Sequence, residues 1–232
     1  MKIITNEKVY DLHESMIASG YAMMEKYDEK EVQSEYNKLL EDSFLNKDEE
    51  NKHYKRIMKL TKSKLNSGHP NALSGVLVSM DVTFSNKVMV EWERYHFQQI
   101  VTSQSTMHRL SKMNLEECFV EQTDKVIIDR LKELQKNYND NPTRENYLKL
   151  VYSCPSGLKL TMRVTTNYLQ LMTMYNQRRN HRLPEWGEFC KELIEKLPYF
   201  YELLEVNGIL DEKDKVEPIG ISQNNYNQSE KL

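Results

Sequence analysis

The chain has 232 residues, of which 39% are hydrophobic and 29% are charged, a composition typical of a globular protein that buries a sizeable core. Its 32 basic and 35 acidic residues leave a net charge of -3, so no overall positive field attracts nucleic acid. No apolar run approaches the ~18 residues of a membrane span, and the first residues lack a secretory apolar core. We therefore expect a cytoplasmic protein whose partners include neither nucleic acid nor a membrane.

Apolar residues at helical spacing dominate the first part of the chain. Between residues 28 and 66 they predict two surface helices, the first carried by Val32, Tyr36, Leu39, Leu40 and Phe44 and the second by Tyr54, Ile57, Met58, Leu60 and Leu65. A turn is expected at residues 68–71. Residues 76–84 then combine β-branched side chains with partial alternation, which predicts a strand buried on at least one face. Helical spacing returns from Asn86 through Trp92.

Turn residues divide the middle of the chain. An apolar stripe predicts a helix over residues 123–138, and a turn over residues 139–143 follows it. Thr143 is expected to cap the next helix, with Asn146 three residues further on. A second break is expected over residues 153–157.

Helical patterns continue over residues 158–177 and over residues 186–204, the second of them broken near Pro198. After about Val216 the sequence becomes polar without an apolar pattern. We therefore expect a single domain over residues 1–215 and a flexible tail over residues 216–232.

The three cysteines, Cys118, Cys154 and Cys190, are widely spaced and include no C-x-x-C pair. They predict neither a disulfide framework nor a zinc site, and we expect no bound metal. Cys154 has no neighbouring activator, so we expect it to be a buried small hydrophobe.

Two clusters of basic and imidazole side chains lie roughly seventy residues apart: His96, His108 and Arg109 in the first, and Arg178, His181 and Arg182 in the second. Such side chains donate charge-assisted hydrogen bonds to phosphate, and Gln104 and Ser105 can read the edge of a base. If folding brings the clusters together, they form an anion pocket. Alternatively, each cluster offsets the dipole at a helix C-terminus or lies on a solvated face.

Several motifs follow one another in a recognisable order. Residues 68–75 read Gly-His-Pro-Asn-Ala-Leu-Ser-Gly, and Pro155, Asn167 and Arg178 come later. This order resembles the flavin-dependent thymidylate synthases, which have a Gly-His-x-Thr-Pro-Phe-Glu-His segment, then a Pro-led segment, an N-L-R-S-L motif and an L-R pair. The resemblance covers most of residues 15–205.

The signature of that family reads R-H-R-x-x-S-x-N-E-x-S-x-R, and its end aligns with Arg109, Ser111 and Lys112. Its start can be placed on residues 94–96 with an insertion after it, or on residues 97–99 without one. We prefer the first placement because it keeps one of three signature residues and keeps Trp92 two residues ahead. The chain resembles a divergent member, because substitutions occur at Gln104, Ser105, Met107 and Leu169.

The resemblance implies an α/β (α+β) fold, rich in helix, with a central mixed, largely antiparallel sheet flanked by helices. It implies an enzyme that reductively methylates dUMP to dTMP, with methylenetetrahydrofolate supplying the carbon and FAD, reduced by NADPH, supplying the hydride. It also implies a homotetramer with shared active sites, in which the two basic clusters can meet across an interface.

The resemblance assigns roles to single residues as well. Arg178 is expected to be catalytic, because it would stabilise charge that develops on the pyrimidine. The substrate is expected to contact Gln104, Ser105, His108, Arg109 and Arg178. The flavin is expected to contact His69, Arg94, Tyr95, His96 and Asn167. Local structural roles are the alternative, since His69 can cap a turn and Asn167 can hydrogen-bond within helices.

Two other functions stay open. The signature substitutions favour a pyrimidine-nucleotide-binding or nucleotide-modifying protein of the same fold without thymidylate synthase activity. A helical interaction protein, whose basic clusters meet an acidic partner, belongs to a different class and predicts no small-molecule ligand.

Overall fold

The computed structural model describes residues 2–38 and 51–211, and a four-stranded sheet forms its centre. The strands lie in the order β1-β2-β4-β3, and they are β1 (Ile4–Tyr10), β2 (Leu77–Ser85), β3 (Gln98–Ser103) and β4 (Lys159–Asn167). Each neighbouring pair is antiparallel. The expected α/β fold with a largely antiparallel sheet flanked by helices is confirmed, and the described strands include no parallel pair.

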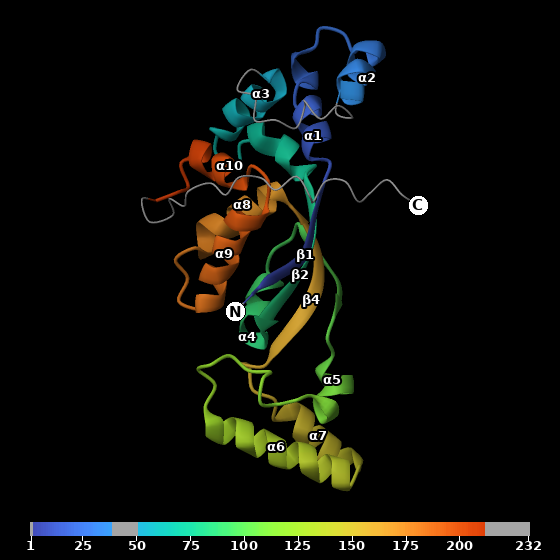
Figure 1. The fold of residues 1–232 in the computed structure, drawn as a ribbon, viewed down its shortest axis with the longest axis vertical. Helices are drawn as coiled ribbons and strands as arrows, with labels where there is room; N and C mark the ends of the chain where they lie inside the picture. Colours follow the sequence, from blue (N-terminus) through green and yellow to red (C-terminus); the bar gives the residue numbers. More distant parts are fainter. Residues whose placement is uncertain (1, 39–50, 212–232) are drawn as a thin grey trace.

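Helices cover one face of this sheet. They are α8 (Tyr168–Arg178), α9 (Pro184–Lys196) and α10 (Phe200–Asn207), which lie together on one side of the strands in Figure 1. Alternation along β2 directs every second side chain into this layer, namely Val78, Met80, Val82 and Phe84. Phe84 meets Phe189 of α9 with ring centroids 5.5 Å apart. Removal of this apolar surface from water is the main force that holds the helices on the sheet.

The other face of the sheet carries polar side chains. Ser79 and Thr165 hydrogen-bond each other across the β2–β4 pair at 2.9 Å. Arg163 of β4 donates to the Asp81 carboxylate of β2 at 3.1 Å. Because these side chains are only partly buried, this face suits water or polar contacts rather than apolar packing.

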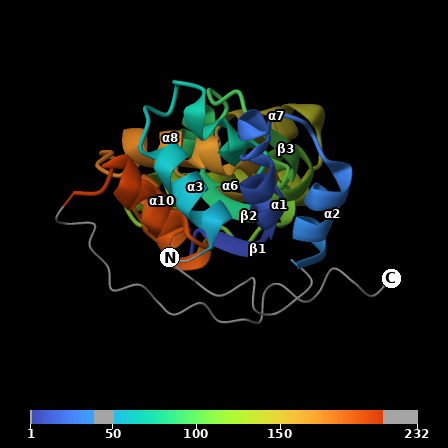
Figure 2. The same ribbon diagram turned by 90° about the horizontal axis from the view of Figure 1, so that it is seen from above.

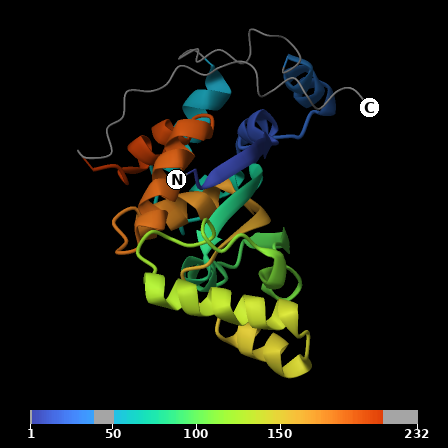
Figure 3. The same ribbon diagram turned by 60° about the horizontal axis from the view of Figure 1, so that its bottom comes forward.

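Further helices lie at the two ends of the sheet (Figures 1 and 3). One end carries α1 (Leu12–Ala18), η1 (Tyr21–Met23), α2 (Glu29–Lys38), α3 (Lys52–Thr61) and η3 (His69–Ser74). The other end carries α5 (Thr106–Arg109), η4 (Leu110–Lys112), α6 (Lys125–Asp140) and α7 (Arg144–Tyr152). Helix α4 (Asn86–Trp92) follows β2 directly, and α10 lies beside α3, as Figure 2 also shows. The α6–α7 end has a small core of its own, which includes Leu131, Leu134 and Leu150.

Several predicted elements are confirmed. The predicted strand is β2, the helix predicted over residues 123–138 is α6, and Thr143 caps α7 by accepting the N–H of Asn146 at 3.2 Å. Helix α9 ends before Pro198 and α10 begins after it. Of the two helices predicted between residues 28 and 66, the positions Leu39, Leu40 and Phe44 lie outside the described residues, as does the predicted tail over residues 216–232.

The helix predicted over residues 158–177 is wrong in its first half, where strand β4 forms. Leu160, Met162 and Val164 alternate with more exposed side chains, which is the two-residue period of a strand with one buried face. Leu160 and Val164 are four residues apart, a spacing that places side chains on one face of a helix as well as of a strand, so the pattern alone favoured a single long helix. The sequence patterns also do not predict β1 and β3, because their sequences, ITNEKVY and QQIVTS, contain too few apolar residues to mark a buried face.

Two buried glutamates of α9 hold one end of the sheet, where antiparallel β1 begins and β2 ends. The Glu192 carboxylate accepts the backbone N–H groups of Ile3 at 2.6 Å and Ile4 at 2.9 Å. The Glu185 carboxylate accepts the backbone N–H of Ser85 at 2.6 Å and its hydroxyl at 2.9 Å. One helix therefore anchors both the start of β1 and the end of β2.

Glu192→Ala is expected to lower the free energy of unfolding by about 2–4 kcal/mol, because two buried N–H groups lose their acceptor. Glu195→Ala is the matched control, since Glu195 is exposed on the same helix and forms only a surface ion pair with Lys191, at 3.8 Å. Urea denaturation of both variants measures the difference. Equal losses would show that the Glu192 contacts contribute nothing specific.

His13 of α1 gives the fold a dependence on pH. Its side chain is buried edge-on to Tyr199, with ring centroids 6.4 Å apart. Burial lowers the pKa of His13 from 6.5 to about 4, so the folded protein holds the neutral imidazole. The unfolded chain takes up the proton more readily. The stability that the neutral ring contributes is therefore present above pH 6.5 and is lost as the pH falls through 4.

On the order of 3 kcal/mol of stability is expected to be lost through His13 between pH 7 and pH 4. His13→Leu should remove this part of the pH dependence, whereas His108→Gln, at an exposed position, should leave it unchanged. Urea midpoints measured across this pH range test the expectation. An unaltered pH dependence in His13→Leu would contradict it.

Candidate functional site

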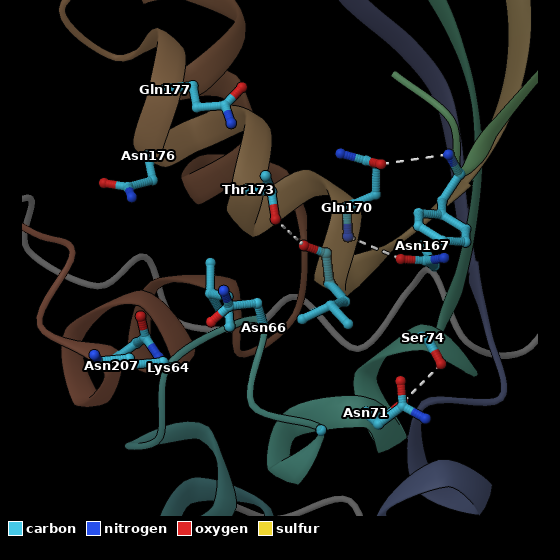
Figure 4. A pocket seen from close by; sticks show the side chains of 14 residues that line it. Lys64, Asn66, Asn71, Ser74, Asn167, Gln170, Thr173, Asn176, Gln177 and Asn207 are labelled. Carbon is cyan, nitrogen blue, oxygen red and sulfur yellow. Dashed lines mark hydrogen bonds between the residues drawn. The ribbon is translucent and has the colours of Figure 1, made fainter. Parts of the chain in front are cut away.

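A pocket of about 1000 Å³ opens between η3 and α8 (Figure 4). Amides supply much of its lining, from Asn66, Asn71, Asn167, Gln170, Asn176, Gln177 and Asn207. Leu65, Phe97 and Leu169 add apolar surface, and Lys64 is the one charged side chain among the described lining residues. This size and mixture suit an organic ligand that both stacks and forms hydrogen bonds.

Local backbone geometry places η3 at one wall. Gly68 has a φ of +81°, a left-handed conformation that favours glycine, and η3 begins at the next residue. Pro70 fits the first turn, where a backbone N–H is not needed. Asn71 and Ser74 line the pocket, whereas His69 is exposed and does not line it.

The start of α8 forms the facing wall. Asn167 caps the helix, because its Oδ1 accepts the N–H of Gln170 at 2.8 Å. Gln170 is 7% exposed, and its Oε1 accepts the N–H of Phe97 at 3.3 Å. These contacts join the segment before β3 to α8. Among the residues expected to contact flavin, Asn167 is the one that lines the pocket.

Arg178 lies at the end of α8, behind the pocket wall. Its guanidinium group donates to Glu91 at 2.8 Å and to the Tyr95 hydroxyl at 2.8 Å, and it lies 4.9 Å from the Trp186 ring centroid. The Tyr95 hydroxyl in turn donates to Gln177 at 3.0 Å. The structure thus brings Arg178 and Tyr95 together, but they meet the pocket through Gln177 and do not line it.

The other residues expected to bind substrate lie toward the α6–α7 end. Gln104 extends β3, and its Oε1 accepts the N–H of Thr161 at 2.8 Å. Ser105 caps α5 by accepting the N–H of His108 at 3.3 Å. His108 and Arg109 are exposed on α5, which Figure 1 shows well away from α8. Within one chain, Arg109 and Arg178 therefore do not share a cleft.

Arg94 and His96 occupy the segment between α4 and β3. Both are exposed, and neither lines the pocket, although the adjacent Phe97 does. Of the residues that the resemblance assigns to the flavin, Asn167 lines the pocket. His69 and His96 do not line it, but each is next in sequence to a lining residue, Gly68 and Phe97 respectively.

Sequence reasoning missed most of the lining amides. The motif at residues 68–75 contains a signal for one lining amide, Asn71, and for one lining hydroxyl, Ser74, because they occupy the Thr and Glu places of the family segment. Lys64, Asn66 and Asn207 carry no comparable signal, since separate segments bring them to the pocket.

The structure also bears on metal binding, on the reactivity of Cys154 and on membrane spans. Within residues 2–38 and 51–211, no group of three His, Cys, Asp or Glu side chains is arranged to hold a metal ion. Burial raises the pKa of the Cys154 thiol to about 11, which disfavours a nucleophilic thiolate. In the described part of the chain, no helix has the length and apolar character needed to cross a membrane.

Comparison with known proteins shows the fold. No family model and no curated protein sequence matches the chain. A structure of flavin-dependent thymidylate synthase ThyX from Helicobacter pylori, complexed with FAD and dUMP, superposes with a TM-score of 0.60 at 16% identity, over 89% of this chain and 99% of that one. A second structure of Helicobacter pylori ThyX with FAD and dUMP gives a TM-score of 0.57 at 17% identity, over 79% and 96% of the two chains. The chain shares the fold of these two structures.

Arg178→Ala is expected to lower the free energy of unfolding by about 2 kcal/mol, because the partly buried Glu91 carboxylate loses its guanidinium partner and Trp186 loses its stacked cation. Arg182→Ala, at an exposed position, should cost no more than about 0.5 kcal/mol. Thermal unfolding of the two variants provides the measurement. An Arg178→Ala protein as stable as the wild type would mean that the fold does not need this arginine.

Proposed function

We propose that the chain is a flavin-dependent thymidylate synthase-like enzyme that reductively methylates dUMP to dTMP. Methylenetetrahydrofolate supplies the carbon, and FAD, which NADPH reduces, supplies the hydride. The pocket between η3 and α8 carries the proposal, because Gly68, Asn71, Ser74 and Asn167 line it from the two motifs that the resemblance associates with flavin. The fold shared with two structures of Helicobacter pylori ThyX, each with FAD and dUMP, supports it.

The residues of the pocket fit a flavin. Amide N–H groups from Gln170 and Gln177 suit the carbonyl oxygens of the isoalloxazine ring. Phe97 is 72% exposed and offers a face on which a flat ring can stack. Lys64 suits a phosphate group, and the volume of about 1000 Å³ is at the upper end for small-molecule sites. His69, Arg94, Tyr95 and His96 would then border or support the flavin rather than enclose it.

The substrate side of the proposal involves another subunit. Gln104, Ser105, His108 and Arg109 bind dUMP in a site that a homotetramer completes, because α5 lies away from the pocket of its own chain. The exposed Arg109 guanidinium group suits the substrate phosphate. Arg178 acts on the site as a positioning residue through Tyr95, since Glu91 holds its guanidinium group.

A second candidate is a pyrimidine-nucleotide-binding protein of the same fold that does not methylate. A specific observation favours it: Leu169 lines the pocket where the family motif has an arginine, and Arg178 is paired with Glu91. The substitution at Leu169 and the pairing of Arg178 with Glu91 both reduce the positive charge that can reach a bound anion.

The purified protein is expected to retain FAD and to be yellow. Lys64→Ala is expected to weaken FAD binding about 10-fold, because one charge-assisted hydrogen bond is lost. Lys62→Ala is the control, since Lys62 is exposed nearby and does not line the pocket. Flavin absorbance after desalting and calorimetric titration provide the two measurements.

Oxidation of NADPH that depends on both dUMP and methylenetetrahydrofolate distinguishes the two candidates. Turnover to dTMP supports the enzyme. Binding of dUMP without turnover supports the second candidate. Colourless protein that binds neither FAD nor dUMP refutes both.

A further inference from the structure

Four amide side chains of α8 and its N-cap line the pocket: Asn167, Gln170, Asn176 and Gln177. The oxygen of each amide accepts a hydrogen bond from another group of the protein. Backbone N–H groups bind the first two, and the guanidinium group of Arg179 binds Asn176 at 2.8 Å. The Tyr95 hydroxyl binds the fourth, Gln177, at 3.0 Å. The NH2 group of each amide is therefore the part that remains for the pocket.

The orientation of these amides follows from the chemistry of their partners. A backbone N–H and a guanidinium group can only donate, so an amide oxygen must face them. Tyr95 receives the Nε–H of Arg178 at 2.8 Å, and the hydrogen of its own hydroxyl is then free for the oxygen of Gln177. Glu91 completes this chain by holding the guanidinium group of Arg178 at 2.8 Å.

Three of the lining residues of α8 share one face of the helix. Gln170, Thr173 and Gln177 are three and four residues apart, which places them on the same side. The Thr173 hydroxyl donates to the carbonyl oxygen of Leu169 at 3.0 Å, so its lone pairs are what it offers a ligand. The face therefore presents a donor, an acceptor and a donor in that order.

The distance between Gln170 and Gln177 along the helix limits how both can bind a single ring. Seven residues rise by about 10 Å along an α-helix, which is longer than the edge of one ring. The two glutamine side chains must therefore lean toward Thr173 to meet a single ring. In the view of Figure 4 the amide groups of Gln170 and Gln177 both turn toward the side of Thr173.

We propose that Gln170, Thr173 and Gln177 recognise the imide edge, O=C–NH–C=O, of a six-membered ring. That edge offers an acceptor, a donor and an acceptor, the complement of this helix face. Uracil and the pyrimidine half of isoalloxazine both carry it, whereas cytosine does not. The choice between these two ligands rests on the proposed function. Tyr95, Arg178 and Glu91 are positioning residues that fix the amide of Gln177.

Gln177→Glu tests the donor directly. The substituted side chain keeps an oxygen for Tyr95 but replaces the NH2 group by a second oxygen, which repels an imide carbonyl. Affinity is expected to fall at least about 10-fold. Gln33→Glu makes the same charge change at an exposed position on α2 and should bind as the wild type does. Calorimetric titration with dUMP and, separately, with riboflavin identifies the ligand. A loss of affinity for either compound in Gln177→Glu supports the imide site and shows which compound binds there.

Tyr95→Phe tests the positioning chain. It removes the hydroxyl that fixes Gln177, so affinity is expected to fall about 3-fold and the preference for the imide should weaken. The preference is the ratio of affinities for dUMP and dCMP, or for riboflavin and 3-methylriboflavin, whose N3 lacks the hydrogen. A general loss of structure would lower both affinities and leave the ratio unchanged, and that outcome counts against the positioning role.

Failure of the imide site and failure of the proposed function have different signatures. If wild type, Gln177→Glu and Gln33→Glu bind the ligand equally, the imide site is overturned and the proposed function stands. If the wild type binds neither riboflavin nor dUMP, the proposed function fails. Nitrogen-15 NMR with free uracil then tests the imide site: shifts of the Gln170 and Gln177 side-chain NH2 signals with uracil but not with cytosine support it, and unchanged signals overturn it.

Discussion

The carboxylate of Glu91 on α4 links the fold to the candidate site, because it collects donors from two further helices. Arg178 at the end of α8 donates to it at 2.8 Å, and the Trp186 indole of α9 donates at 3.0 Å. The Glu91 side chain is 23% exposed, so a charge there needs such donors to offset its partial loss of hydration. Arg178 in turn holds Tyr95, and Tyr95 holds Gln177. A contact that packs three helices together therefore also determines which atoms the pocket presents.

The sequence predicts those parts of the protein whose cause is local. Thr143 caps α7 through a contact within three residues, and the β-branched residues of β2 favour an extended backbone whatever their partners. Strand β4 depends instead on pairing with β2 and β3, and its apolar residues satisfy a helical period as well, so local pattern could not distinguish the two. Arg178 shows the same limit at the site. Its chemistry suits an anion, but Glu91, distant in sequence, determines what it binds.

The pocket itself illustrates what a family resemblance can and cannot locate. Asn167 is predicted through a motif, and the structure adds the reason for its place, which is the N-cap of α8. Lys64 and Asn207 come from segments that meet only after α10 packs beside α3, a contact in which Asn207 donates to the carbonyl oxygen of Ser63 at 2.9 Å. Residues whose position depends on such a packing step are invisible to any pattern that is read along one segment.

The distance between α5 and α8 leads to a last conclusion about assembly. Both hydrophobic cores of the described residues are built from side chains of one chain. The polar residues of α5 are exposed, however, and two apolar neighbours are exposed with them, Val101 at 59% and Met107 at 61%. Apolar side chains surrounded by polar ones are the composition of many subunit interfaces. In the proposed enzyme, the complete site therefore belongs to the assembly, so its occupancy depends on protein concentration, whereas the cores that position α5 and α8 are built within each chain.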